Sequence, residues 1–182
     1  MNKNIRIFAA TLLVFTIFIN YPERIFSQSW DTYDISFSGC SASFPYEPEW
    51  DLSYSDDSSL VWLGEVLDSD MFFGLICIEF NEPFSADYTK DDLILVAENY
   101  LDYLQSEFNI VAHTGYSSGY TVSHNEDACW VTDEWEDAEG DPWLVKVYAD
   151  PFNMAVMYIY SSLEYTMEDY REVFFNSFRF PE

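Results

Sequence analysis

The most regular apolar pattern in the chain runs from Trp143 to Ser161, WLVKVYADPFNMAVMYIYS. It predicts two strands joined by a turn at residues 150–153, because Pro151 fixes φ and flanking Asp and Asn side chains favour turns. Side chains alternate between the two faces of a strand. Those expected on one face are Trp143, Val145, Val147, Ala149, Met154, Val156, Tyr158 and Tyr160, and those on the other are Leu144, Tyr148, Ala155, Met157 and Ile159. Apart from Lys146 both faces are apolar, which predicts the centre of a sheet covered on both sides.

Shorter apolar runs predict the other strands. They are expected at residues 34–46 with an interruption at Gly39, and at 60–67, 71–80, 110–114, 120–124, 128–137 and 178–180. Residues 47–59 are expected to form a loop, because they contain Pro48 and a polar run. Turns at 68–70, 117–118 and 139–141 would join successive runs into hairpins.

Two helices are predicted between these strands. The first begins at Thr89 with Asp92 three residues on, a capping-box spacing, and its apolar stripe is Leu93, Val96, Ala97, Tyr100, Leu101, Leu104 and Phe108. The second is expected to be capped by Thr166 with Asp169 and to run to Asn176. The predicted fold class is α+β, a twisted antiparallel β-sheet with one helix packed on each face.

The N-terminus has the pattern of a secretory signal peptide. Lys3 and Arg6 precede an apolar run over residues 7–19, and Ser27 and Ser29 are small residues placed for cleavage before Trp30. The run is shorter than a bilayer-spanning helix, so an uncleaved anchor is the weaker alternative. We therefore expect residues 1–29 to be a signal peptide and residues 30–182 a single exported domain, periplasmic or extracellular, with no stable membrane anchor after cleavage.

The charge balance is strongly acidic. Seven Lys and Arg residues face 33 Asp and Glu residues, a formal net charge of −26. Such a chain would be repelled by nucleic acid and by anionic membrane surfaces. A soluble, self-repelling surface is the simplest explanation, while cation binding, a basic partner and a salty habitat are the alternatives.

The order of elements and the C-terminal sequence EDYREVFFNSFRF, residues 168–180, resemble the PsbP-type fold. This fold is shared by extrinsic subunits of photosystem II and by small exported bacterial domains such as the lipoprotein DcrB. The resemblance implies an antiparallel sheet flanked by helices, in accessory or binding proteins without established catalysis. It carries no functional residue across, and this chain lacks the lipoprotein cysteine of the DcrB type.

Candidate chemistry is sparse. Cys40, Cys77 and Cys129 would permit one disulfide in an exported protein, with three possible pairings. GxSxG, HExxH and CxxC patterns do not occur. The carboxylate run at residues 133–141 fits no EF-hand register, and a solvated hairpin tip is the expected alternative to a weak calcium site.

A metal site is the most specific hypothesis. If residues 117–118 form a two-residue turn, His113 and His124 become diagonal neighbours on one face of a hairpin, with Glu126 two residues further along. These three side chains could hold Zn²⁺. A shifted register, with the histidines apart, is the alternative.

Aromatic residues suggest a binding surface. Trp50, Trp62 and Trp135 lie beside predicted loops or turns and are the candidates for an accessible platform that binds sugars or apolar ligands, although packing in the core or on a half-exposed sheet is the more ordinary role for them. The function predicted from the sequence is an exported non-catalytic accessory or interaction domain that needs no cofactor and binds an unknown protein or small ligand. The alternative is a cation-dependent binder or a hydrolase that uses acidic residues.

Overall fold

The centre of the fold is a hairpin of strands β9 (Pro142–Ala149) and β10 (Asn153–Ser161). The protein is described by a computed structural model over residues 29–85, 87–162 and 164–181. In the hairpin Met154 pairs with Ala149, and Tyr160 pairs with Trp143. This register places the two predicted sets of side chains on opposite faces, so the predicted phase of both strands is confirmed.

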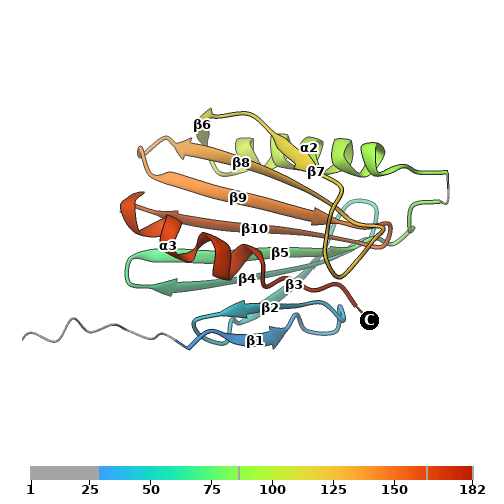
Figure 1. Ribbon diagram of the computed structural model, residues 1–182, viewed down its shortest axis with the longest axis horizontal. Coiled ribbons are helices and arrows are strands. Elements are labelled where there is room, and N and C mark those ends of the chain that lie inside the picture. The colour runs from blue at the N-terminus through green and yellow to red at the C-terminus, as the bar shows by residue number, and fades with distance from the viewer. Residues whose placement is uncertain (1–28, 86, 163, 182) are drawn as a thin grey trace, which may run out of the picture.

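Six strands add to this hairpin in one antiparallel, eight-stranded sheet when β7 is counted beside β6 (Figure 1). The order is β3-β4-β5-β10-β9-β8-β6, and β7 pairs with the remaining free part of β8. The bounds are β3 (Trp50–Tyr54), β4 (Leu60–Asp68), β5 (Met71–Glu79), β6 (Ile110–His113), β7 (Ser117–Gly119) and β8 (Cys129–Asp137). The turn between β4 and β5 lies where the sequence predicts it, with Ser69 and Asp70 both at positive φ.

Helices α2 (Lys90–Glu107) and α3 (Glu164–Phe175) complete the described part of a mixed α+β fold. Thr89 caps α2 through the predicted reciprocal bonds with Asp92, which confirms the capping box. Helix α3 begins at Glu164, so Thr166 lies inside it and the predicted cap is wrong.

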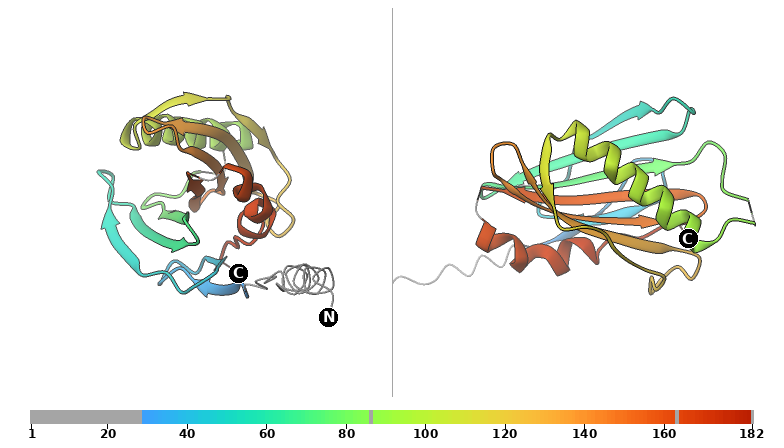
Figure 2. Two further views of the ribbon diagram at one scale, coloured as in Figure 1. Left: turned by 90° about the vertical axis from the view of Figure 1, so that its left-hand side faces the viewer. Right: turned by 90° about the horizontal axis from the view of Figure 1, so that it is seen from above.

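The core consists of two clusters of buried side chains. One contains Leu144, Met157 and Ile159 from one face of the central hairpin together with Phe174 of α3. The other contains Val145, Val147 and Val156 from the opposite face together with Leu101 of α2. Figure 2 shows that the sheet is strongly curved, with α2 near one end of it and the β3–β4 hairpin at the other.

The N-terminal region forms a separate two-stranded sheet. Strands β1 (Asp31–Asp34) and β2 (Ser41–Phe44) replace the single interrupted strand that was predicted, because a tight loop with Gly39 at φ 75° reverses the chain between them. Ile35 is fully buried in this loop, whereas Phe37 points outward and is 95% exposed. Arg179 forms a one-residue bridge to Ser41, and this bridge is all that forms of the strand predicted at 178–180.

Two predictions about the edges of the sheet are wrong. Residues 47–59 contain the edge strand β3, whose mostly exposed side chains gave no apolar alternation. Residues 110–124 do not form a hairpin, because β6 and β7 both pair with the nine-residue strand β8. Gly115, at φ 97°, lies in the connection between β6 and β7.

The predicted signal peptide at residues 1–29 lies outside the described residues except for Ser29, the first of them. Among the described helices, neither is long and apolar enough to cross a membrane.

Candidate binding cleft between α2 and the β3–β4 hairpin

Helix α2 covers only part of the sheet face on which it lies. It packs over β8, β9 and β6, at one side of the curved sheet. Leu63 of β4 pairs with Ile76 of β5, which belongs to the α2 core cluster, so Leu63 lies on the same face. Leu63 is nevertheless 40% exposed, and Leu67 further along β4 is 56% exposed. The β4 side of this face is therefore open to solvent.

A cleft of about 780 Å³ lies between this open region and α2. Its helical wall consists of Val96, Asn99, Tyr100 and Tyr103, and its apolar floor of Val61, Ile78, Phe80 and Met154. The opposite lip is polar and consists of Ser53, Tyr54, Ser55, Asp56, Asp57 and Ser59. The cleft thus combines aromatic and aliphatic walls with an acidic lip.

Hydrogen bonds fix the acidic lip in place. The Asp57 carboxylate accepts bonds from the backbone N–H and the hydroxyl of Ser59, both at 3.0 Å, and from the Ser55 hydroxyl. The bond from Ser55 and those from Ser59 lower the pKa of Asp57. Asp57 is therefore a fixed negative charge at neutral pH. Ser59 in turn accepts a bond from the backbone N–H of Asn81 at 3.1 Å, which ties the lip to the end of β5.

A tyrosine–carboxyl pair lies on the same face. The Tyr158 hydroxyl donates to Glu65 at 3.2 Å, and the Tyr158 ring lies over Gly74, where any Cβ would overlap it. Because Gly74 sits between them in the cross-strand row, its missing side chain is what lets Tyr158 reach Glu65. Burial raises the pKa of Glu65 above its usual range, although the hydrogen bond from Tyr158 opposes this shift.

A row of stacked aromatic rings lies next to the Tyr158–Glu65 pair on the same face of the sheet. Phe72 stacks on Tyr160 with ring centroids 4.4 Å apart, and Tyr160 stacks on Trp143 at 4.1 Å. Phe108, which follows α2, stacks on Trp143 at 5.1 Å. Burial and the nearby Glu65 raise the pKa of Tyr160 to about 12. The rings use their faces to pack on one another, so this row stabilises the sheet and ties the end of α2 to it.

The tryptophans predicted to be accessible are mostly internal. Trp62 is 2% exposed and Trp135 is 3% exposed, because both occupy inward positions of alternating strands. Trp50 is half-buried and packs edge-on against Phe44. None of the three lines the cleft beside α2. The expectation of an accessible platform built on Trp62 and Trp135 is therefore wrong.

The predicted histidine site does not assemble, because the hairpin that would bring its residues together is not formed. His113 lies on β6 with Nδ1 3.4 Å from the Asp133 carboxylate. His124 faces Phe180 instead, and burial lowers its pKa. Glu126 is exposed, and its backbone carbonyl accepts a bond from Lys90. Within the described ranges, no three side chains of the types that bind metals gather in one place.

The acidic run at residues 133–141 is only partly a solvated tip. Asp133 and Asp137 are 2% and 8% exposed. The indole N–H of Trp135 donates to Asp133, and that of Trp143 donates to Asp137, each at 2.9 Å. Backbone N–H groups donate to the second oxygen of each carboxylate. Both aspartates therefore act as internal acceptors that order the ends of β8.

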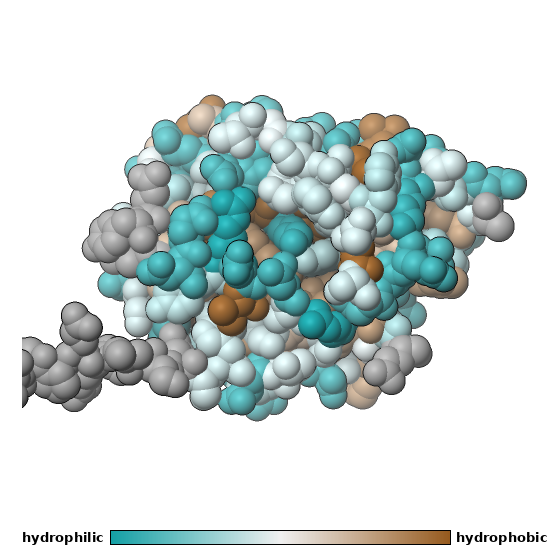
Figure 3. Space-filling view, viewed as in Figure 1, coloured by the Kyte–Doolittle hydropathy of each residue, from teal (hydrophilic) through white to brown (hydrophobic). Residues whose placement is uncertain are grey.

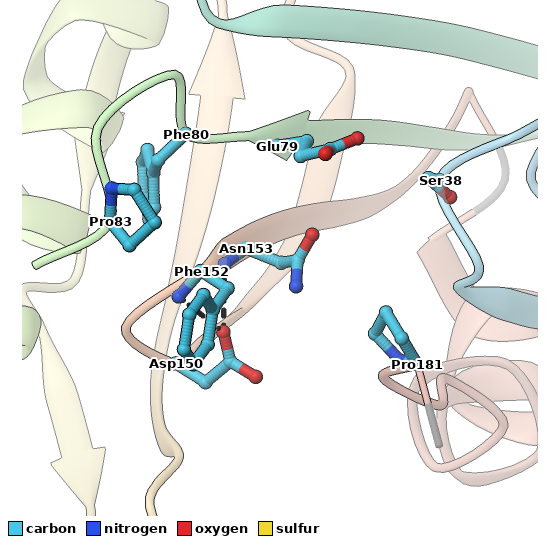
Figure 4. Close-up of a pocket in the computed structure, with 8 residues that line it drawn as sticks. All are labelled: Ser38, Glu79, Phe80, Pro83, Asp150, Phe152, Asn153 and Pro181. Atoms are coloured by element: carbon cyan, nitrogen blue, oxygen red, sulfur yellow. Dashed lines mark hydrogen bonds between the residues drawn. The ribbon is translucent and has the colours of Figure 1, made fainter.

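A smaller hollow of about 350 Å³ lies where the β9–β10 turn meets the C-terminus (Figure 4). Among the residues that line this hollow, Asp150 most resembles a catalytic acid, since burial raises its pKa. Its carboxylate, however, accepts bonds from the backbone N–H groups of Phe152 and Asn153 at 2.8 and 2.7 Å and from the Asn125 side chain at 2.9 Å. Asp150 thus holds the turn that the sequence predicts.

The α3 side of the molecule shows only small hydrophobic patches among hydrophilic residues (Figure 3).

By sequence, no protein-family model and no curated protein matches the chain. By structure, it is similar to cyanobacterial PsbP (CyanoP) from Synechocystis sp. PCC 6803, with a TM-score of 0.52 and 13% sequence identity over 87% of this chain and 96% of that one. The chain shares the PsbP-type fold. At this identity the likeness concerns the fold alone.

Sequence reasoning missed the cleft, although one signal for it was present. The apolar residues of α2, the predicted stripe together with Ile94 and Tyr103, are spread widely around the helix, and the structure divides most of them into two rows. Leu93, Ile94, Ala97, Leu101 and Leu104 are buried. Val96, Tyr100 and Tyr103 form a second row along the cleft instead. An apolar stripe wider than one sheet contact requires is the signal that a helix borders a second surface.

Proposed function

We propose that the chain is an exported, non-catalytic interaction domain that binds a basic, partly apolar segment of a partner protein in the cleft between α2 and the β3–β4 hairpin. In this proposal each face of the sheet is covered by one helix, as in DcrB-type exported domains, and only the β4 side of the α2 face is left for the partner. The leader pattern at residues 1–29 supports export.

The observation that carries the proposal is the combination of apolar walls and a fixed acidic lip in the cleft. Tyr100 and Tyr103 offer aromatic surface, which contributes strongly to protein interfaces. Asp56 and Asp57 lie opposite them, in a chain whose formal net charge is −26. A segment that alternates apolar side chains with Lys or Arg would satisfy both features and would be attracted over distance by the net charge.

The edge strand β3 supports an extended form of that segment. β3 pairs only with β4 among the described strands, and its residues Ser53 and Tyr54 line the cleft. An open strand edge offers unpaired N–H and C=O groups to an added strand. The acidic residues beside the open edge of β3 would repel a second copy of this negatively charged chain, so a basic partner is favoured over a second copy.

The hydrolase alternative has less support. Catalysis by acidic residues requires carboxyl groups that converge on a substrate with perturbed pKa values. Of the buried aspartates, Asp133, Asp137 and Asp150 each accept several internal bonds, and Asp68 accepts one from the Tyr46 hydroxyl at 3.3 Å. Burial raises the pKa of both Asp150 and Glu65, but Asp150 holds the β9–β10 turn and Glu65 is bonded to Tyr158.

A binding titration with matched variants tests the proposal. The probe is a short synthetic peptide that alternates Lys and Leu, and the control peptide replaces each Lys by Glu. Tyr103 lines the cleft and Leu95 lies outside it on the same helix, and the two are 53% and 55% exposed. We expect the basic peptide alone to bind. Tyr103→Lys should weaken it by about tenfold or more, and Leu95→Lys by less than about threefold. Equal binding of both peptides, or equal effects of both substitutions, would contradict the proposal.

A further inference from the structure

Two of the three cysteines meet in the core beneath the small β1–β2 sheet. Cys77 lies in the central strand β5, opposite Trp62 on β4 and Ala155 on β10. Cys40 immediately precedes β2, and both cysteines are fully buried. Both belong to the same core cluster, and the neighbouring Cys40 thiol, together with burial, raises the pKa of Cys77 well above its usual range. Ser38, whose hydroxyl accepts a bond from the Cys40 N–H, lines the same hollow as Glu79, two residues after Cys77, so the two thiols are neighbours where the two sheets meet.

The backbone holds Cys40 in this position. The Ile35 N–H donates to the Cys40 carbonyl at 2.8 Å, and the Cys40 N–H donates to the Ser38 hydroxyl at 3.1 Å. On its other side, Ser41 exchanges two backbone bonds with Arg179, at 3.0 and 2.8 Å. Cys40 is thus fixed by the loop before it and by the C-terminal bridge after it. Its placement does not depend on the contact with Cys77.

Cys129 is separated from this pair by the sheet. It pairs with Ala149 on β9 and belongs to the core cluster that contains α2. Cys40 and Cys77 belong to the opposite cluster, which contains α3. A disulfide requires Cα atoms within about 7 Å of each other. Of the three pairings that the sequence leaves open, only Cys40 with Cys77 joins residues on the same side of the sheet.

We propose that Cys40 and Cys77 form a structural disulfide that ties the β1–β2 sheet to the central strand β5, and that Cys129 stays a free thiol. Each thiol loses a proton, and the pair gives two electrons to a disulfide-containing oxidant, either a thiol–disulfide oxidoreductase or glutathione disulfide. The oxidant disulfide is cleaved to two thiols through a mixed disulfide, and the Cys40–Cys77 bond forms as that mixed disulfide breaks.

The burial of both sulfur atoms determines when the disulfide can form during folding. Exchange needs an accessible thiolate. In the folded protein both cysteines are inaccessible and the thiolate of Cys77 is disfavoured. The bond therefore forms while the chain folds, or when the β1–β2 sheet opens from the core. The completed bond is protected from reductants in the same way.

The test is refolding of the full chain in a glutathione redox buffer, followed by alkylation, intact-mass measurement and peptide mapping. We expect one alkylated cysteine, Cys129, one cross-linked pair of peptides, and a mass that is about 2 Da below that of the reduced protein once the single alkyl group is subtracted. Cys129→Ser should give the same cross-link, while Cys40→Ser should give none. Folded, reduced protein should react with glutathione disulfide at least about tenfold more slowly than protein in denaturant.

Two results would overturn the proposal. One is a cross-link that includes Cys129 in the refolded wild type. The other is three alkylated cysteines after the wild type has refolded in the oxidising buffer. Both are read on the wild type alone, so the conclusion does not depend on whether a Cys→Ser variant folds. Because the oxidant is added in vitro, the result is also independent of the proposed export and of the proposed partner.

Discussion

Gly74→Ala should destabilise the protein through one contact, that with Tyr158. A Cβ at position 74 would overlap the Tyr158 ring, which is 3% exposed and packed on the α2 side of the sheet. Overfilling a packed site costs about 1–3 kcal/mol. Moving the ring also weakens the 3.2 Å bond from its hydroxyl to Glu65, and such a bond contributes about 0.5–1.5 kcal/mol. The reduced entropy of the unfolded chain offsets about 0.4–1 kcal/mol. We expect a net loss of about 1–3 kcal/mol in the free energy of unfolding.

A double-mutant cycle with Tyr158→Val separates the ring contact from any effect of the backbone. The smaller side chain leaves room for the new methyl group. In that background Gly74→Ala should therefore cost less than about 0.5 kcal/mol or should stabilise the protein. The assay is urea unfolding followed by tryptophan fluorescence, with midpoints and slopes compared for all four proteins. The same loss in both backgrounds would refute the explanation, because the strain would then not arise from the Tyr158 ring.

Three further predictions follow from the fold and the charges. Because the pKa of Glu65 is raised in the folded state, folding favours its neutral form. The ionised Glu65 side chain therefore lowers the free energy of unfolding, and this loss is absent at acid pH and appears as pH rises above the ordinary carboxyl range. The stability of Glu65→Gln relative to wild type should accordingly increase between acid and neutral pH, and a constant or falling difference in thermal midpoint would contradict this. Leu101→Ala and Phe174→Ala each truncate a fully buried helix residue and should each cost about 2–5 kcal/mol, whereas unchanged urea midpoints would mean that the helix concerned does not seal its core cluster. Protein recovered from its native host should lack about the first 29 residues by intact mass, and a full-length mass in the membrane fraction would show that the leader is retained.

The sequence predicts the middle of the sheet well because there the apolar pattern is dense. Both faces of the β9–β10 hairpin must be buried, so only one phase of each strand is possible, and it is the observed one. The cap of α2 is equally local, since Thr89 and Asp92 bond to each other's backbone N–H groups. Local chemistry and burial on both faces leave few alternatives at these positions.

The edges of the sheet could not be predicted in this way. β3 is mostly exposed and carries a polar sequence, so it resembles a loop. β6 and β7 each look like one half of a hairpin, yet both pair with β8, whose length offers room for two partners. Asp133 and Asp137 look solvated in the sequence, because the indole N–H groups that bond to them lie two and six residues away. The cleft depends on how far α2 extends over the curved sheet, and that distance is a property of the assembled fold.

In the proposed function, a basic, partly apolar segment binds between α2 and the β3–β4 hairpin. The most direct test of this binding is hydrogen–deuterium exchange of the full chain with and without the alternating Lys–Leu peptide. We expect slower exchange of backbone amides in β3 and in the lip at residues 55–59 when the peptide is bound, with no change in β6 or in the β1–β2 sheet. Protection confined to the α3 side of the molecule, or no protection at peptide concentrations that saturate binding, would contradict the proposed function.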